Sequence, residues 1–410
     1  MKILFIFEAQ KNSANANITK LIASQLKRMN HIVDAGYFLN VTNDVADNDN
    51  IFNKKFIVQD NRTQKFILQR ETIDWLSMDS ITKIMYCIHY PNYMVNYLIY
   101  SLGSFALKKK WIRRIEQFCK SENIDVVIGV SFPFDISRLV SQVRGVKYKC
   151  LISLDPYAYN SMLPKKKKNK RLIDEKDVIE RCFRVFTTDL IKMDLIKNEE
   201  MKKLSDRIVT IEFPLINDES RVNKKTDKRI ISNKQGEIAF LHPGTFYPDI
   251  RNPEKLVRLF EKLPDNYMLY VAGHNSYEIL KYSNKINNRV IDLGCLDKTQ
   301  IQQAMQEADF LICYNNTTYN QVPSKLFDCI NTGKPILNLC QIHNCPTLKY
   351  VENYEYSYTL YTDTYSDYLC DFCKFVETKK GLICDKSDIL KLFEQCTIKF
   401  VTEIIEKELV

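Results

Sequence analysis

The segment YNQVPSKLFDCINTGKPIL at residues 319–337 decides the fold class of this chain. It follows one apolar run, DFLICY, and leads into another, PILNL, so it predicts a strand, a loop, a helix and a second strand. Pro323 suits the first helical turn, where no backbone donor is needed. Gly333 suits the helix C-cap, and Pro335 follows it. The segment therefore predicts one unit of an alternating α/β fold.

The same alternation extends over most of the chain. Ten strands are expected, at Lys2–Phe7, Asp125–Val130, Lys149–Leu154, Phe183–Thr187, Ile208–Glu212, Glu237–Leu241, Tyr267–Ala272, Arg289–Leu293, Asp309–Tyr314 and Pro335–Leu339. Amphipathic stretches lie between them, at 18–29, 111–120, 135–144, 174–182, 253–262, 299–307 and 323–332. Strands that are apolar on both faces indicate parallel sheets covered by helices on each side. Ten such strands exceed one compact domain and suit two doubly wound ones.

The domain boundary is expected in the segment 213–236, which is polar, charged and without an apolar period, as linkers are. We therefore expect one domain over residues 1–215 and a second over 216–385. The last stretch, 386–410, has helical spacing of apolar residues and is expected to form a closing helix or two that packs back toward the first domain. A length of 410 residues agrees with this division.

Composition excludes several classes of protein. Hydrophobic residues make up 45% of the chain and charged residues 27%, which is ordinary for globular proteins and argues against disorder and fibrous folds. Only 10 glycines are present, and neither GxGxxG nor GxxxxGK[ST] occurs, which argues against a plain dinucleotide site and a P-loop. No apolar run reaches 18 residues, and the start, MKILFIFEAQ, lacks the features of a signal peptide.

The 13 cysteines have two interpretations. Their odd number and their places in apolar segments indicate reduced core thiols of a cytosolic protein, as at Cys87, Cys150, Cys182, Cys313 and Cys329. The alternative is a zinc site that uses the pair Cys370 and Cys373 or the cluster Cys340, His343 and Cys345. These two groups differ in form and are 25 or more residues apart, unlike the matched knuckles of structural zinc sites. We therefore expect no metal.

Positive charge is concentrated at residues 164–171, PKKKKNKR, within a chain of net charge +9. This run is either a solvated loop or a patch for anionic lipid or polyphosphate. Nucleic acid is a weaker option, since no RNA-binding aromatic motif accompanies the run. A second unusual stretch, 81–117, is rich in aromatic and aliphatic residues and ends in KKKWIRR. It is either a pair of buried helices or an interfacial amphipathic segment in which Trp111 inserts shallowly.

Lys325 and Asp328 are the first candidate site residues. Lys325 falls in the first turn of the predicted helix, where a cation opposes the helix dipole. An anion such as phosphate bound at this helix end would account for it, and Asp328 could accept hydrogen bonds from ribose hydroxyls. The alternative is that the two side chains form an i,i+3 ion pair on the surface.

The same residues carry a family resemblance. Pro323-Ser324-Lys325-Leu-Phe-Asp328, continued through Gly333 and Pro335, resembles the donor-binding helix of the family 4 retaining glycosyltransferases, in particular of the bacterial polysaccharide type. Two departures stand out: Asp328 replaces the usual Glu, and Asn320 stands where the family has a first acidic residue. Other segments resemble the family in the same order, among them FLHPGTFYPDIRNPEKL, YMLYVAGHN, VIDLGCL and AMQEADFLICYNN.

The resemblance implies the GT-B fold, with two Rossmann-like doubly wound domains that face a cleft and a C-terminal closing helix. It also implies transfer of a sugar, with retention, from a nucleotide-diphosphate-sugar to a hydroxyl acceptor. Arg251 and Lys325 would act on the departing diphosphate. Donor binding would involve Gly244, Thr245, Gly273, Leu296, Asn320, Pro323, Ser324 and Asp328. Acceptor binding would involve Ser13, Asn15, Asn17, Phe132 and Asp155.

Further expectations concern cofactors, partners and location. No cofactor is expected beyond the nucleotide-sugar co-substrate, and no Asp-x-Asp metal motif occurs. The basic run and the aromatic segment fit a lipid-linked saccharide acceptor and an anionic membrane surface. The expected location is the cytoplasm, with peripheral binding at the inner face of the cell membrane, and nucleic acid is not an expected partner.

Alternatives remain for single residues and for the whole protein. Arg251 is otherwise a surface residue at a helix start, His242 a satisfied core histidine and Asp155 the cap of a turn. The protein itself is alternatively a binding module for nucleotide sugars or glycans without turnover, to which the departure at Asn320 points. A third reading is a nucleotide-sugar epimerase of the same fold.

Overall fold

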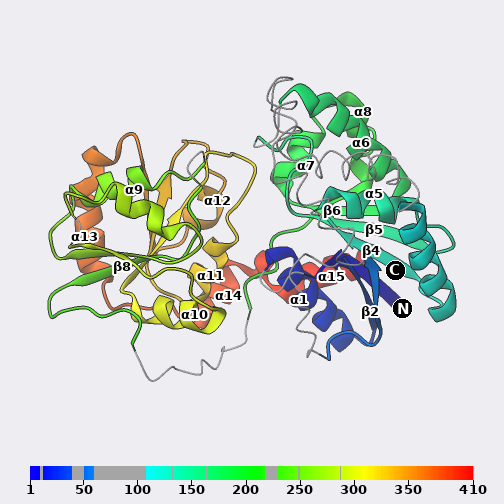
Figure 1. Ribbon diagram of the computed structural model, residues 1–410, viewed down its shortest axis with the longest axis horizontal. Helices are drawn as coiled ribbons and strands as arrows, with labels where there is room; N and C mark the ends of the chain where they lie inside the picture. The colour runs from blue at the N-terminus through cyan, green and yellow to red at the C-terminus, as the bar shows by residue number, and fades with distance from the viewer. Residues whose placement is uncertain are drawn as a thin grey trace, which may run out of the picture. The chain divides into compact units, whose positions relative to one another are not determined.

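The computed structural model describes residues 1–9, 13–38, 50–59, 108–131, 133–161, 165–217, 229–247, 250–286 and 288–409 (Figure 1). The chain forms two compact units. Unit 1 consists of Met1–Pro214 together with Ile398–Val410, and unit 2 consists of Leu215–Thr397. Each unit is a parallel sheet with its own hydrophobic core.

Unit 1 contains a seven-stranded parallel sheet in the order β3-β2-β1-β4-β5-β6-β7. Its strands are β1 (Lys2–Glu8), β2 (Ile32–Phe38), β3 (Lys55–Gln59), β4 (Val126–Val130), β5 (Tyr148–Ser153), β6 (Arg184–Thr187) and β7 (Ile208–Thr210). The chain winds outward from β1 to β3, returns to the centre and then winds the other way from β4 to β7. The winding direction therefore reverses between β1 and β4.

Helices flank this sheet as expected for a doubly wound fold. They are α1 (Ala14–Arg28), a helix at 108–122, α5 (Phe134–Gln142), α6 (Lys168–Arg181), α7 (Asp189–Leu195), α8 (Glu199–Lys202) and α15 (Ile398–Leu409), with 3-10 turns at Lys165–Lys167 and Ser205–Arg207. Helix α1 begins after the N-cap Ser13, whose hydroxyl accepts a hydrogen bond from the Ala16 N–H at 3.2 Å.

Unit 2 contains a six-stranded parallel sheet in the order β10-β9-β8-β11-β12-β13. Its strands are β8 (Ile238–His242), β9 (Tyr267–Val271), β10 (Val290–Asp292), β11 (Phe310–Tyr314), β12 (Ile336–Cys340) and β13 (Ser357–Tyr361). Its helices are α9 (Pro253–Phe260), α10 (Lys298–Glu307), α11 (Lys325–Asn331), α12 (Leu348–Val351), α13 (Leu369–Lys379) and α14 (Lys386–Leu392), with 3-10 turns at Ser276–Lys281, Tyr365–Tyr368 and Glu394–Cys396.

All ten strands expected from the sequence are present, and two doubly wound α/β units are confirmed. The sequence missed β2, β3 and β13. Strand β2 contains a buried aspartate, Asp34, which breaks the apolar run; its carboxylate is satisfied by the Lys54 N–H at 2.8 Å. Strands β3 and β13 lie at sheet edges, where burial is partial and the apolar pattern is weak.

The C-terminal stretch divides between the two units. Helix α14 lies in unit 2, whereas α15 lies in unit 1 and packs on α1. Two side-chain contacts hold α15 there. The His31 Nε2 atom lies 2.7 Å from the Glu406 carboxylate, and the Arg184 Nε–H donates to Glu408 at 2.6 Å.

For Trp111 the alternative of a buried helix holds, and the expected insertion of its ring into a membrane surface is wrong. Trp111 is only 3% exposed and packs edge-on against Phe38, with ring centroids 5.9 Å apart, so it cannot insert into a bilayer. The basic run is not a loop either: from Lys165 onward it forms a 3-10 turn and the start of α6, with Arg171 buried. Most of the stretch 81–117, and Cys87 within it, lies outside the described residues. Across the ranges that the structure describes, no helix has the length and apolarity to cross a membrane.

Candidate functional site

The carboxyl ends of β8 and β11 form the centre of the candidate site in unit 2. From β8 the chain winds to β9 and β10 on one side, and from β11 to β12 and β13 on the other, so the winding reverses between β8 and β11. In open α/β sheets, ligands bind at this position, outside the carboxyl ends of the strands. The segments that follow β8, β9, β10 and β11 carry Gly244, Thr245, Gly273, Leu296, Asn320, Pro323 and Ser324.

Backbone contacts between these segments depend on glycine. Gly273 has φ of +149°, and a Cβ atom on it would lie 2.7 Å from the Gly244 carbonyl oxygen and 2.8 Å from its carbonyl carbon. The Gly273 N–H donates to the Gly294 carbonyl at 2.9 Å. The segments after β8, β9 and β10 therefore pack backbone to backbone, which only glycine at position 273 permits.

Arg251 supplies the main positive charge of this site. It is 8% exposed, so the alternative that it is a surface residue is wrong. Its Nη1 donates to the Thr245 carbonyl at 2.9 Å and its Nη2 to the Asn316 Oδ1 at 2.7 Å. Burial lowers the pKa of Arg251, yet a guanidinium remains charged. Among the described residues no carboxylate lies within ion-pair distance of it, and its Nε–H has no partner there.

His242, the last residue of β8, lies beside this guanidinium. Its Nδ1 is 3.1 Å from the Ile312 carbonyl and must donate to it, which leaves Nε2 as an acceptor. Within the described ranges Nε2 has no hydrogen-bond partner. Burial, and then the charge of Arg251, lower the pKa of His242 to about 3, so the ring is neutral. The interpretation of His242 as a satisfied core histidine therefore holds for only one of its two nitrogens.

The segment after β11 contributes polar groups that the sequence reasoning missed. Asn316 binds Arg251, and Thr318 is buried with a hydroxyl that has no partner in the described part of the chain. Gln341 donates to the carbonyls of Ile250 and Asn315, both at 2.7 Å, and so fixes the turn before Arg251. The sequence does contain a sign of this segment: the polar run NNTTYN comes directly after an apolar strand.

Helix α11 differs in detail from the expectation. It begins at Lys325, with Ser324 as N-cap, so Pro323 precedes the helix and is not in its first turn. The Lys325 Nζ lies 3.0 Å from the Asp328 carboxylate, and the lysine side chain is 48% exposed. This i,i+3 pair accounts for the charge of Lys325 without a ligand. Gly333 ends the helix as expected, with φ of +74°.

The predicted acceptor-side residues lie in unit 1. Ser13 caps α1, and the Asn15 side chain donates to the Ser131 carbonyl at 3.3 Å, which brings both residues to the place where the winding of this sheet reverses. Asn17 lies one turn into α1, and Asp155 follows the end of β5. Phe132 lies outside the described residues. The structure thus groups Ser13 and Asn15, whereas Asp155 belongs to another edge segment.

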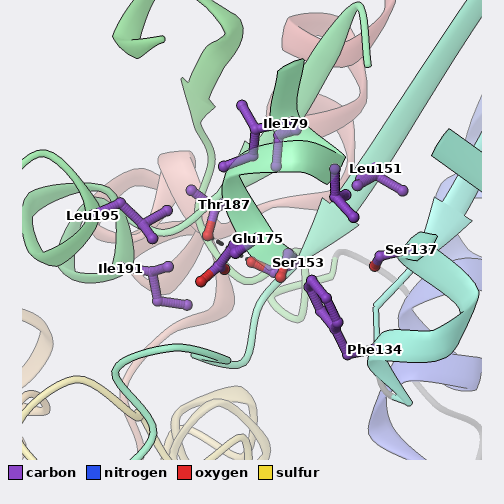
Figure 2. Close-up of a pocket in the computed structure, with 11 residues that line it drawn as sticks. Phe134, Ser137, Leu151, Ser153, Glu175, Ile179, Thr187, Ile191 and Leu195 are labelled. Atoms are coloured by element: carbon purple, nitrogen blue, oxygen red, sulfur yellow. Dashed lines mark hydrogen bonds between the residues drawn. The ribbon is translucent and has the colours of Figure 1, made fainter. Parts of the chain in front are cut away.

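A small pocket lies at the same edge of the unit 1 sheet, between α5, α6, α7 and the ends of β5 and β6 (Figure 2). Its polar lining consists of Ser137, Ser153, Glu175 and Thr187, and its volume of about 10 Å³ has room for a single water molecule. Burial raises the pKa of Glu175 to about 7. The sequence reasoning missed Glu175, because a glutamate in a charged helix is ordinarily solvent-exposed.

The two cysteine groups weighed as zinc ligands do not assemble into a site. Cys340 and Cys345 are buried, whereas His343 is exposed and lies 3.0 Å from Asp363. Cys370 and Cys373 lie on α13. Over the ranges that the structure describes, no three His, Cys, Asp or Glu side chains gather in a way that could hold a metal ion.

Treatment with a strong chelator should leave the melting temperature and the nucleotide affinity unchanged. The reason is that the described residues of the candidate site are Arg251, His242 and amide groups, without a cluster of carboxylates among them. Differential scanning fluorimetry and metal analysis of the purified protein check this. Stoichiometric zinc, or a lower melting temperature after chelation, would contradict it.

Solved structures share this architecture over the whole chain. The lipopolysaccharide outer core galactosyltransferase WaaB matches with a TM-score of 0.59 and 13% identity, covering 100% of this chain and 99% of that one. HepE of Anabaena, solved in complex with UDP and glucose, matches with a TM-score of 0.64 and 13% identity at the same coverage. Sucrose-phosphate synthase of Thermosynechococcus elongatus matches with a TM-score of 0.61 and 10% identity, covering 99% and 98%.

No protein-family model matches the chain. No curated protein matches it in sequence either. At 10–13% identity the solved structures establish the fold and not the activity. Together with the two parallel sheets, they show that the chain has the GT-B fold, with two Rossmann-like α/β domains.

Proposed function

We propose that this protein is a glycosyltransferase that transfers a hexose from a nucleotide-diphosphate-sugar to a hydroxyl acceptor, with retention and without a metal ion. The acceptor would be a lipid-linked saccharide of cell-surface polysaccharide synthesis, reached from the cytoplasmic face of the membrane. The observation that carries the donor half of this proposal is the buried Arg251 guanidinium, which only neutral oxygens contact among the described residues.

A buried charge without a counter-ion is costly, so a site built around one favours an anionic ligand. The diphosphate of a nucleotide sugar is such an anion. Ligands of open α/β sheets bind at the carboxyl edge where the winding reverses, and Arg251 lies at that edge. The Nε–H of Arg251 and the Thr318 hydroxyl, without partners in the described ranges, can donate to phosphate oxygens. HepE, which shares the fold, was solved with UDP and glucose bound, which supports the same class of donor for this chain.

The chemistry follows from stabilisation of the leaving group. The bond between the anomeric carbon and the diphosphate oxygen breaks, and the acceptor oxygen bonds to the same face of the sugar. The acceptor proton leaves with the departing diphosphate. Arg251 offsets the charge that develops on the diphosphate, which is the electrostatic contribution that such a site makes to the rate. His242, neutral and with Nε2 as an acceptor, adds no competing positive charge.

Two measurements test the proposed function and its alternatives. Isothermal titration with UDP should show binding, and incubation with UDP-glucose should show slow release of glucose in the absence of an acceptor. Binding without any hydrolysis or transfer would favour a non-catalytic module. Conversion of the nucleotide sugar to its epimer without an acceptor would favour an epimerase. Absence of binding to UDP and to other nucleoside diphosphates would overturn the donor-site assignment.

The membrane part of the proposal now depends on five lysines, Lys165–Lys168 and Lys170, because Arg171 and Trp111 are buried. Each lysine near an anionic surface contributes about 1 kcal/mol. Changing all five to Gln should therefore abolish most binding to anionic vesicles at physiological salt. Co-sedimentation with vesicles of anionic and of neutral lipid, at two salt concentrations, checks this.

A charge-matched control separates the patch from total charge. It carries Gln at five exposed lysines elsewhere, namely Lys281, Lys285, Lys374, Lys391 and Lys399. This control should pellet with anionic vesicles as the unchanged protein does. Equal pelleting of the five-lysine variant, the control and the unchanged protein would remove the patch from the proposal.

A further inference from the structure

Glu175 is a buried carboxyl group outside the donor site. It lies on α6, is 5% exposed, and accepts a hydrogen bond from the Ala158 N–H at 3.1 Å. Ala158 belongs to the segment 154–160, which leaves the carboxyl end of β5 and carries Asp155. Figure 2 shows Glu175 in the wall of the pocket together with Ser153 and Thr187. A side chain of α6 therefore anchors the backbone of an edge segment.

Two aromatic contacts anchor the same segment on either side of Ala158. The Tyr157 ring stacks on Phe134 with centroids 3.6 Å apart, and its hydroxyl accepts from Arg138 at 2.7 Å. The Lys168 Nζ lies over the Tyr159 ring at 4.0 Å. Both contacts hold side chains of the segment, those of Tyr157 and Tyr159. The Glu175 carboxyl differs because it binds the main chain between them.

The charges around Glu175 do not neutralise it fully. On its own helix, the nearby cation is Arg171, which is itself buried. On the side of α5, Arg138 is already bound by Asp135, Asp174 and Tyr157.

On the side of α7, the titratable groups near Glu175 are Tyr159, Asp194 and Lys197. The Lys197 Nζ pairs with the Asp194 carboxylate at 2.6 Å. The Ser137 hydroxyl, on the pocket wall, has no partner within the ranges described. Within the described residues, the cation nearest to Glu175 is thus Arg171, and the Ser137 hydroxyl of the pocket has no partner.

We propose that Glu175 is a positioning residue, which holds the segment 154–160 closed against α6 while it is protonated and lets the segment open when it is ionised. The proposal rests on the proposed function only in treating Asp155 as an acceptor contact. The Ala158 N–H and Arg171 favour the ionised carboxylate, but the burial of the group in the closed segment outweighs both and favours the protonated form. Opening of the segment brings water to the carboxylate, which satisfies its charge.

The sign of the pH effect follows from linkage. Burial raises the pKa of Glu175 to about 7, whereas a hydrated glutamate has a pKa of about 4.3. The closed segment therefore binds the proton more tightly than the open one. Closure is fully stabilised below the lower value and loses stability as pH rises through the higher one. Between pH 5 and pH 8 the opening equilibrium should shift by roughly 80-fold.

Hydrogen exchange of the Ala158 amide, corrected for the intrinsic rate, tests this between pH 5 and pH 8. In the unchanged protein the protection factor should fall by roughly 80-fold as pH rises. In Glu175→Gln it should be independent of pH. In Glu175→Asp, which keeps an ionisable group, a pH dependence should return. Glu180→Gln, an exposed position on the same helix, is the matched control and should behave as the unchanged protein.

Two results would overturn the proposal: a protection factor that does not change with pH in the unchanged protein, or a slope that persists in Glu175→Gln. Protection of the β4 amides reports that each variant is folded. Titration of the same samples with UDP separates this proposal from the donor site, since UDP binding reports on unit 2. Loss of UDP binding with the slope intact would count against the proposed function and not against Glu175.

Discussion

Replacing Arg251 by Ala should raise the dissociation constant for UDP by about tenfold to a hundredfold. Each lost charge-assisted hydrogen bond to phosphate costs about 1.5–3 kcal/mol, and about 1.4 kcal/mol corresponds to a factor of ten. The guanidinium is buried, so solvent screens its interaction with an anion only weakly. Isothermal titration with UDP measures the change, and the melting temperature without ligand reports that the variant is folded.

Two other variants serve as a control and a comparison for Arg251→Ala. Arg258→Ala removes an exposed arginine on α9 that pairs with Glu254, and it should leave UDP affinity unchanged. Lys325→Ala should have a smaller effect than Arg251→Ala, because Lys325 is half exposed and already pairs with Asp328. Unchanged affinity in both Arg251→Ala and Lys325→Ala would remove the donor-site assignment.

Replacing Gly273 by Ala should destabilise unit 2 by about 3 kcal/mol or more. An L residue at φ of +149° is strained, and the added Cβ would lie 2.7 Å from a backbone oxygen that cannot rotate away. The melting temperature should fall by about 6–12 °C, at about 2–4 °C for each kcal/mol in a domain of this size. Thermal denaturation followed by circular dichroism checks the stability, and UDP titration checks the displaced Gly244 segment.

Gly236→Ala is the matched control. Gly236 lies in the same unit with φ of +90°, yet a Cβ atom there would meet nothing within 4 Å. This variant should therefore show only the smaller cost of the backbone conformation. Equal losses in Gly236→Ala and Gly273→Ala would mean that the close contact between Gly273 and Gly244 contributes nothing.

Apolar runs that are buried on both faces made the sheets predictable from the sequence. β11 and the first four residues of β8 are continuous apolar runs, and the helices between such strands keep a helical period. Strand β2 was not predicted because it contains Asp34. The burial of this aspartate depends on the Lys54 N–H, which lies 20 residues away in the chain. No local pattern contains that contact.

In the candidate site, too, local features could be predicted from the sequence and contacts between distant segments could not. Family resemblance predicted that Gly244, Gly273 and Arg251 follow strands at one edge of a sheet, and they lie there, since short motifs fix which residues follow each strand. The burial of Arg251 and its bond to Asn316 join segments 65 residues apart, and so they needed the structure. For Trp111 the aromatic composition left a buried helix and a membrane surface both open, and the packing against Phe38 shows that the ring is buried.

The placement of α15 has a consequence for synthesis on the ribosome. Unit 1 begins with Met1, yet it is complete only when α15 reaches α1 and Glu406 meets His31. The whole of unit 2 is translated in between. At about 5–20 residues per second this takes on the order of tens of seconds, during which the face of α1 that α15 covers is open to chaperones and to other nascent chains. Unit 2, in contrast, is one continuous stretch of chain, so the second unit to be synthesised can finish folding before the first.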